Sequence, residues 1–182
     1  MKVLVPLVDG FEEIEAMTVV DVLRRAGLEV VTTGLVSTVV EGAHNIKVIA
    51  DKRFTEINPN TFDVLILPGG NPGYINLANS NKIMNLIKEF GEKKKLICAI
   101  CGAPFVLVKA GILDDKIATI YPGMENKLPK PRVGRVVIDK NIITSQGPGT
   151  AMLFALKIVE RLVGKSKLLE LKDELVFKEN TL

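Results

Sequence analysis

Cys101 is the residue of this sequence best placed to do chemistry, and it lies in the segment KKLICAICGAP. An apolar run ends at this cysteine, and two small residues, Gly102 and Ala103, follow it. This pattern predicts a nucleophile on a sharp turn between a strand and a helix, where backbone approaches backbone closely. Free N–H groups at the helix start would favour the thiolate and lower the pKa of the cysteine. We therefore predict a reactive Cys101 rather than a small buried hydrophobic residue.

Cys98 and Cys101 together form a C-x-x-C pattern, which is also found in redox disulfides. If Cys98 lies in an extended strand, its Cα is about 10 Å from that of Cys101. A disulfide tolerates a Cα separation of at most about 7 Å. Thioredoxin-type pairs instead place both cysteines around the helix start. The spacing therefore favours two separate thiols.

Glu15 is the second candidate, within a helix predicted over 12–25. On that helix it shares a face with three apolar residues, Val19, Val22 and Ala26. This stripe would point toward the sheet, whereas Glu12 and Glu13 are expected to be solvated at the helix start. A buried carboxyl without a cationic partner has a raised pKa, so a protonated Glu15 could donate a hydrogen bond to a thiolate. The alternative is a surface glutamate on a poorly phased helix.

The only histidine, His44, is far in sequence from both candidates. A hydrolytic cysteine needs an imidazole that takes and returns a proton, so the sequence offers no obvious Cys-His pair. A lone histidine is more often a surface loop residue. One histidine and two cysteines are too few ligands for a zinc site, and we predict neither a metal nor an organic cofactor.

Alternating apolar runs and amphipathic segments predict an α/β fold. Strands are expected over 3–8, 29–35, 64–67, 96–100, 117–120, 136–139 and 142–145. Helices are expected over 12–25, 81–92, 102–110 and 150–163, with Thr150 as a cap, followed by an amphipathic helix carrying Leu168, Leu171 and Leu175. The segments 39–40 and 46–50 predict a small antiparallel excursion.

Strands that alternate with helices imply right-handed βαβ units and a doubly wound, mostly parallel sheet sandwiched by helices. In such sheets, sites form outside the carboxyl ends of the strands. Three predicted strands end there in small turns: Asp9-Gly10, Gly69-Gly70 and Cys101-Gly102. No linker or repeat interrupts the chain, so we expect a single domain over 1–182.

Composition indicates an ordinary globular protein of 182 residues, with 47% hydrophobic and 25% charged residues and a net charge of +3. The basic run 93–95 is typical of a solvated helix end, so we predict no nucleic-acid partner. We find neither a membrane span nor the cleavage site of a signal peptide. Two cysteines without an export signal indicate reduced thiols and a cytoplasmic location.

Four motifs, GFEEIEA with DVLRRAG, DVLILPGGNPG, LICAICGAP and ITSQGPGTA, resemble the ThiJ/PfpI superfamily in order and over essentially the whole chain. The similarity is to the branch of the parkinsonism-associated protein deglycase and its bacterial relatives. It implies a flavodoxin-like sandwich and a homodimer. It also implies that Cys101 is the reactive cysteine, Glu15 its hydrogen-bonding acid, and the Gly70 and Gly102 N–H groups its anion pocket. Gly69 is a candidate for a further contact with substrate or with the dimer interface.

The sequence departs from this family at Tyr121-Pro122, where members proposed as glyoxalases or deglycases often have a histidine before the proline. The change argues against a histidine-assisted mechanism and against a protease triad. We expect Tyr121 to orient substrate or close the pocket. His44 occupies a position where the family often has an arginine that approaches the partner subunit's site; the alternative is an exposed loop imidazole.

The resemblance implies a cofactor-free glyoxalase or deglycase that acts on small aldehydes or dicarbonyls, or on their early adducts. The alternative is a non-enzymatic stress sensor or chaperone controlled by oxidation of Cys101. An intracellular cysteine protease is a third, less favoured interpretation.

Overall fold

The computed structural model describes residues 1–178, and its strands are short and mostly buried. They are β1 (Lys2–Leu7), β2 (Glu29–Gly34), β3 (Val39–Glu41), β4 (Lys47–Ile49), β5 (Lys52–Arg53), β6 (Val64–Leu67), β7 (Leu96–Ile100), β8 (Val136–Asp139) and β9 (Ile142–Ser145). Seven of them form one sheet in the order β5-β2-β1-β6-β7-β9-β8. Every pairing in it is parallel except that of β8 with β9. Strands β3 and β4 form the predicted small antiparallel pair.

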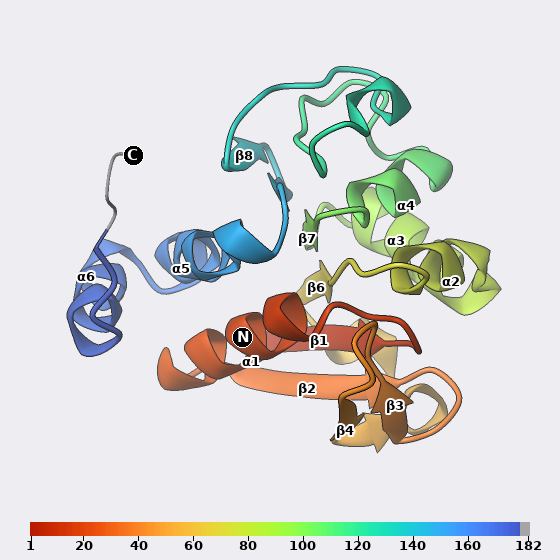
Figure 1. Ribbon diagram of the computed structural model, residues 1–182, viewed down its shortest axis with the longest axis horizontal. Coiled ribbons are helices and arrows are strands. Elements are labelled where there is room, and N and C mark those ends of the chain that lie inside the picture. The colour runs from red at the N-terminus through yellow and green to blue at the C-terminus, as the bar shows by residue number, and fades with distance from the viewer. Residues whose placement is uncertain (179–182) are drawn as a thin grey trace.

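The α-helices lie on both faces of this sheet (Figure 1). They are α1 (Glu13–Arg25), α2 (Gly73–Asn79), α3 (Asn81–Glu92), α4 (Pro104–Lys109), α5 (Ala151–Leu162) and α6 (Lys165–Glu174). Short 3-10 helices occur at Phe54–Glu56, Pro59–Thr61, Glu125–Lys127 and Pro148–Thr150. The flavodoxin-like, doubly wound α/β class predicted from the sequence is confirmed.

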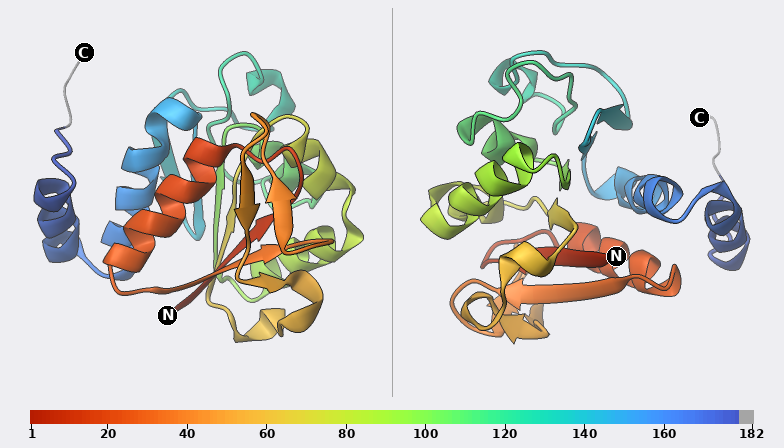
Figure 2. Two further views of the ribbon diagram at one scale, coloured as in Figure 1. Left: turned by 60° about the horizontal axis from the view of Figure 1, so that its bottom comes forward. Right: turned by 180° about the vertical axis from the view of Figure 1, so that it is seen from behind.

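Alternation along β1 divides the core between two layers, since successive side chains of a strand point to opposite faces. Val3 and Val5 pack with the side of the molecule formed by α1 and α5, whereas Leu4 packs with α2, α3 and α4. Helix α6 lies outside α5, farther from the sheet, as Figure 2 shows. Its Leu168 and Leu171 are buried there as predicted, whereas Leu175 is the C-cap residue just after the helix and is half-buried.

Three local predictions need correction. Residues 117–120 are not a strand: only Ala118 forms a bridge, to Pro131, because β8 already occupies the open edge of β9. Thr150 precedes α5 as expected but does not cap it, since its hydroxyl bonds Gly147 and Ser145 instead. The helix expected over 102–110 is confined to α4, which has six residues and begins at Pro104.

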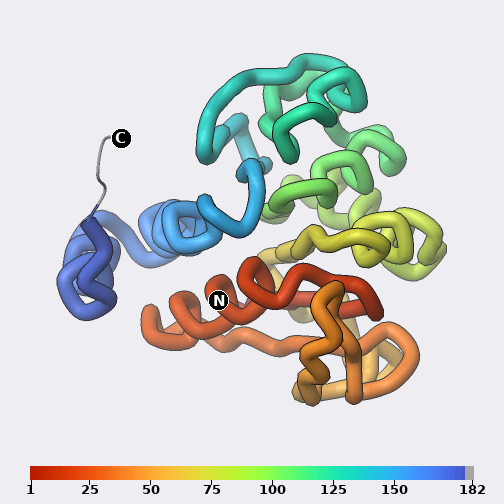
Figure 3. The backbone as a smooth tube through the Cα atoms, viewed as in Figure 1, coloured from red at the N-terminus to blue at the C-terminus, as the bar shows by residue number. Residues whose placement is uncertain are grey.

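The β3–β4 hairpin lies against the start of α1 (Figure 3). Its turn is tied down by a hydrogen bond of 2.8 Å from the N–H of Ala43 to the carbonyl of Phe11. This contact brings His44 beside the first turn of α1.

None of the helices in the described part of the chain has the length and apolar character that a membrane crossing requires.

Candidate active site

The three small turns singled out in the sequence meet at one edge of the sheet. Strands β1, β6 and β7 are neighbours, so their carboxyl ends lie side by side. The Glu12 N–H donates to the Gly69 carbonyl at 3.0 Å, which joins the first turn to the second. A Cβ on Gly69 would lie 2.5 Å from the Cβ of Cys101, so the second and third turns are in direct contact.

Cys101 adopts a left-handed backbone conformation, with φ of 62°. Such a conformation costs a non-glycine residue on the order of 1–3 kcal/mol, so surrounding contacts must impose it. Its N–H donates to the Ser145 carbonyl at 3.0 Å, and its carbonyl accepts from the Tyr121 N–H at 2.9 Å. These bonds hold the cysteine on the sharp strand-to-helix turn that the sequence predicted.

Glycines beside the thiol leave room for nothing larger. A Cβ on Gly102 would lie 2.7 Å from the ring of Tyr74. Gly70 has φ of 96°, and a Cβ there would collide with the carbonyl of Gly10. Both backbone N–H groups interact with the thiol of Cys101 and lower its pKa. Each of these two contacts by itself favours a negative charge on the sulfur.

Glu15 is fully buried beneath the cysteine, on the face of α1 that the sequence predicted. Its Oε2 accepts a hydrogen bond of 2.8 Å from the Gly69 N–H. Oε1 is buried and has no hydrogen bond of standard geometry to the residues that the structure describes. Burial raises the pKa of Glu15 to about 7, because it outweighs the stabilising bond from Gly69.

The pKa of Cys101 is not lowered, contrary to the expectation from the sequence. Burial raises the pKa of the thiol to about 12, with the Glu15 carboxylate as the second cause. The N–H groups of Gly70 and Gly102 act in the expected direction but are outweighed. The short α4 begins only at Pro104, so helix-end potential does not reverse the effect of burial.

Cys101 and Glu15 therefore form a coupled pair. A carboxylate on Glu15 keeps the proton on sulfur, whereas a protonated Glu15 removes the negative charge that opposes thiolate formation. Near neutral pH the sulfur keeps its proton, and Glu15, with a pKa of about 7, can gain or lose a second one. This arrangement suits a cysteine that must lose and regain a proton during a reaction.

A cavity of about 400 Å³ opens above the thiol. Its lining includes Cys101, Gly70, Gly102 and Tyr121, so the structure brings four of the predicted site residues together. Tyr121 is 47% exposed, at the outer part of this cavity. The lining also contains residues that the sequence analysis missed: Glu12, Asn71, Tyr74, Met124 and Pro148. For Asn71 and Tyr74, the run PGGNPGY directly after β6 was an available signal.

Cys98 lies in the interior of β7 and is fully buried. Burial raises the pKa of its thiol. Neither cysteine forms a disulfide, as the spacing argument predicted.

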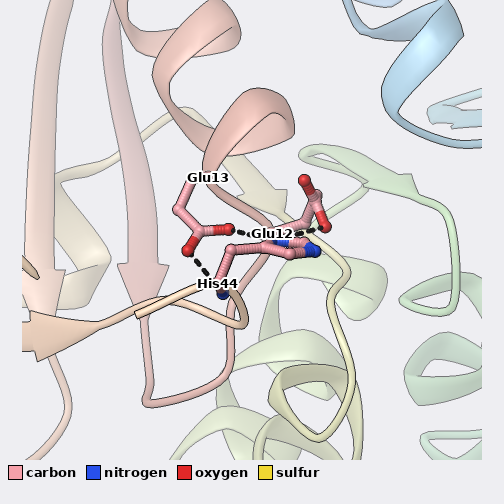
Figure 4. Close-up of side chains that lie close together, drawn as sticks. All are labelled: Glu12, Glu13 and His44. Atoms are coloured by element: carbon pink, nitrogen blue, oxygen red, sulfur yellow. Dashed lines mark hydrogen bonds and ion pairs between the residues drawn. The ribbon is translucent and has the colours of Figure 1, made fainter. Parts of the chain in front are cut away.

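Glu12 and Glu13 are buried, at 8% and 6% exposure, so the expectation that they are solvated is wrong. His44 from the β3–β4 turn covers them: its Nδ1 lies 2.8 Å from Glu13 Oε2 and 3.7 Å from Glu12 Oε2 (Figure 4). Burial opposes the charge on Glu13, but hydrogen bonds from the His44 side chain and backbone outweigh it and lower the pKa. The hydrogen bond that the imidazole donates to the Glu13 carboxylate is the main cause that raises the pKa of His44.

Comparison with known proteins gives a consistent result. The model of the DJ-1/PfpI family matches residues 1–161. Glutathione-independent glyoxalase DJR-1.2 of Caenorhabditis elegans is 39% identical over 169 residues, which cover 91% of this chain and 89% of that protein. Toxoplasma gondii DJ-1, solved in an oxidized form, superposes with a TM-score of 0.94 at 36% identity, covering 97% of this chain and 98% of the other.

Two relatives from Arabidopsis thaliana are considerably longer than this chain. Protein DJ-1 homolog B and Protein DJ-1 homolog A are each 40% identical over 174 residues, which cover 93% of this chain. The matched region covers only 40% and 44% of those two proteins.

Proposed function

Since this chain belongs to the DJ-1/PfpI family, we propose that it is a cofactor-independent glyoxalase- or deglycase-type enzyme that acts through Cys101. The observation that carries the proposal is the coupled pair: a thiol at the floor of an open cavity with a fully buried carboxyl group beneath it. The C. elegans relative, which is named a glyoxalase, supports the reaction class.

The reaction begins with addition of sulfur to a small dicarbonyl such as methylglyoxal. The Cys101 sulfur forms a bond to the aldehyde carbon, and the carbonyl oxygen takes the proton that the pair supplies. The N–H groups of Gly70 and Gly102 stabilise the negative charge that develops in this step. The product is a hemithioacetal attached to Cys101.

Glu15 then acts as the proton shuttle, and its raised pKa of about 7 suits this role near neutral pH. The carboxylate removes the hydrogen of the former aldehyde carbon as a proton and returns it to the neighbouring carbon. The proton of the hemithioacetal hydroxyl passes to the oxygen of the former ketone, and the two transfers together give a thioester of a 2-hydroxy acid. Water attacks the thioester, the carbon–sulfur bond breaks, and sulfur regains a proton. Methylglyoxal plus water thus gives lactate.

Tyr121 takes no part in proton abstraction in this scheme. Its phenol hydroxyl offers a hydrogen-bond donor to a bound substrate. Its place at the outer part of the cavity favours a role in orienting substrate or closing the pocket. Gly69, whose N–H bonds Glu15, positions the shuttle instead of contacting substrate.

A stress-sensor function is the second candidate. Glu15 Oε1 has no hydrogen-bond partner of standard geometry within residues 1–178, so a protonated carboxyl could donate to an oxygen added to Cys101. The oxidized form of the T. gondii relative is consistent with such chemistry in that protein. Under this alternative, peroxide converts Cys101 to a sulfinate and alters a chaperone or partner-binding surface.

A cysteine protease is the least favoured function. The only histidine of the sequence is held by Glu13, and Tyr121-Pro122 occupies the family position where a histidine is often found. The imidazole that a hydrolytic cysteine requires is therefore not supplied at that position.

Lactate formation from methylglyoxal in amine-free buffer tests the enzymatic proposal. The wild-type protein should form lactate, and Cys101→Ser should not; equal rates would exclude the proposed nucleophile. Cys98→Ser serves as the matched control and should keep the activity if it folds.

Mild peroxide followed by mass spectrometry tests the sensor alternative. The wild-type protein should stop at the Cys101 sulfinate, and Glu15→Leu should reach a different oxidation state because the donor is gone. Identical spectra would exclude a contact between Glu15 and the oxidised sulfur.

A homodimer and a cytoplasmic location remain predictions, and sedimentation analysis would test the homodimer.

A further inference from the structure

Glu12, Glu13 and His44 bring three potential ligand atoms to within 4.8 Å of one another. Figure 4 shows the imidazole lying between the two carboxylates. We propose that these three residues form a binding site for a divalent transition-metal ion of the Zn²⁺ type, at the edge of the Cys101 cavity. No metal was predicted from the sequence, because only cysteine and histidine were counted as ligands there.

Glu13 is held in a conformation suited to metal binding. Its Oε1 accepts a hydrogen bond of 2.7 Å from the backbone N–H of His44, which turns Oε2 toward the imidazole. Gly42 fits tightly against this carboxylate, where a Cβ would collide with it. One oxygen thus anchors the β3–β4 turn while the other stays beside the ring nitrogen. Second contacts of this kind orient the ligands in known metal sites.

Glu12 provides an independent observation that points to a bound cation. Its side chain is 10% exposed, and its Oε2 faces His44 Nδ1 at 3.7 Å. Within residues 1–178 its carboxylate accepts no hydrogen bond, and the ion pair with His44 is its one close charged contact. The imidazole is thus the charged partner of Glu12 within these residues, and a metal ion bound by all three side chains would take the place of the Nδ1 proton and contact the Glu12 carboxylate directly.

The ligand types select the class of ion. One imidazole nitrogen and two carboxylate oxygens suit Zn²⁺ and similar ions better than Mg²⁺ or Ca²⁺, which prefer oxygen ligands alone. Tetrahedral zinc with bonds of about 2.0–2.1 Å places neighbouring ligand atoms about 3.3 Å apart. The observed separations from Nδ1, 2.8 Å and 3.7 Å, bracket that value. His44 is 66% exposed on its side chain, so water can reach a fourth position.

Titration of the chelator-stripped, full-length protein with Zn²⁺, followed by calorimetry, tests the site. We expect one saturable equivalent per chain. Co²⁺ then serves as a spectroscopic probe, because its paramagnetism should shift the ring proton NMR signals of the single histidine. Its absorption spectrum should lack the charge-transfer band of a thiolate ligand.

His44→Ala is the main variant, since this exposed side chain can be removed with little effect on folding. It should weaken Zn²⁺ binding at least tenfold, as should Glu12→Gln. Cys101→Ser should bind as the wild type does, because the thiol is not a ligand. Glu41→Gln is the matched control: this acid lies three residues before His44, pairs with Lys47, and should not affect binding.

Three results would overturn the proposal. The first is the absence of saturable binding up to about 1 mM Zn²⁺. The second is binding that survives His44→Ala but is lost in Cys101→Ser, which would place the ion on the thiol. The third is an equal loss in Glu41→Gln, which would indicate attraction by surface charge alone.

Discussion

Glu13 and Glu15 lie in the same first turn of α1 and are both buried, but their pKa values are shifted in opposite directions. The pKa of Glu15 is raised to about 7, chiefly by burial, whereas that of Glu13 is lowered despite burial. The difference lies in their partners: Glu15 faces a thiol, and Glu13 accepts two hydrogen bonds from His44. One helical turn thus contains a carboxyl group that keeps a proton near neutral pH and another that does not.

This contrast separates chemistry from structure within one turn. A carboxyl group with a pKa near the working pH can take and return a proton. A carboxylate locked to an imidazole and a backbone N–H instead holds the β3–β4 turn in place. Substitutions that remove the charge but keep the shape of each side chain should therefore have opposite consequences.

The largest effect should come from Glu15→Gln on catalysis. The amide cannot shuttle a proton, so kcat/KM for lactate formation from methylglyoxal should fall by about 10²–10⁴-fold. Asp21→Asn is the matched control, since this exposed acid lies on the same helix and, within residues 1–178, forms its ion pair with Arg25. Equal activity of Glu15→Gln and the wild type would remove Glu15 from the mechanism.

The next effect concerns stability, where Glu15→Gln should be beneficial. An acid whose folded pKa exceeds its ordinary value stabilises the fold fully below about pH 4.5 and loses that contribution as pH rises toward 7. Between these values the wild type should lose up to about 3 kcal/mol relative to the variant. Urea unfolding at pH 4 to 8 measures the difference. A difference independent of pH would contradict the raised pKa.

Glu13→Gln should have the opposite and smaller effect. A lowered pKa contributes stability above the ordinary value of 4.5, and this is lost as pH falls through the folded pKa. The hydrogen bond between Glu13 and His44 is strongest while the imidazole is charged. Because the pKa of His44 is raised, this bond stabilises the fold up to mildly alkaline pH and weakens once the imidazole loses its proton. The variant should be destabilised by about 1 kcal/mol in the mildly acidic window between these limits.

Urea unfolding in the presence of a chelator measures the Glu13→Gln effect without any contribution from bound metal. Glu15→Gln should become more stable relative to the wild type as pH rises. The same trend in Glu13→Gln would contradict a lowered pKa of Glu13.

Much of this site could be predicted from the sequence because periodicity decides which side of a helix is buried. The positions of Glu15 and Cys101 followed from an apolar stripe and from a strand that ends in small residues. The burial of Glu12 and Glu13 could not be predicted in this way, since a turn thirty residues later covers them. The pKa of Cys101 was also missed, because helix-end potential is a local property and burial depends on the whole fold.

The segment 117–120 shows the same limit. Its apolar pattern satisfies the rules for a strand, but a strand also needs a free edge, and β8 occupies it. The apolar residues of this segment still pack into the core, since Ala118 and Ile120 are buried.

Glu12 offers the finest test, because its charge raises the pKa of both Glu15 and His44. Glu12→Gln should therefore lower the pKa of Glu15 and that of His44. Both shifts should be small, because the charge of Glu12 is not the main cause of either raised pKa. NMR can follow the single histidine and, with carboxyl-labelled glutamate, Glu15 in one sample containing a chelator. Added salt should weaken the effect on exposed His44 more than that on buried Glu15. The prediction would be contradicted if Glu12→Gln changed only the pKa of His44 and Glu41→Gln changed it by the same amount. The charge of Glu12 would then have no specific effect on Glu15.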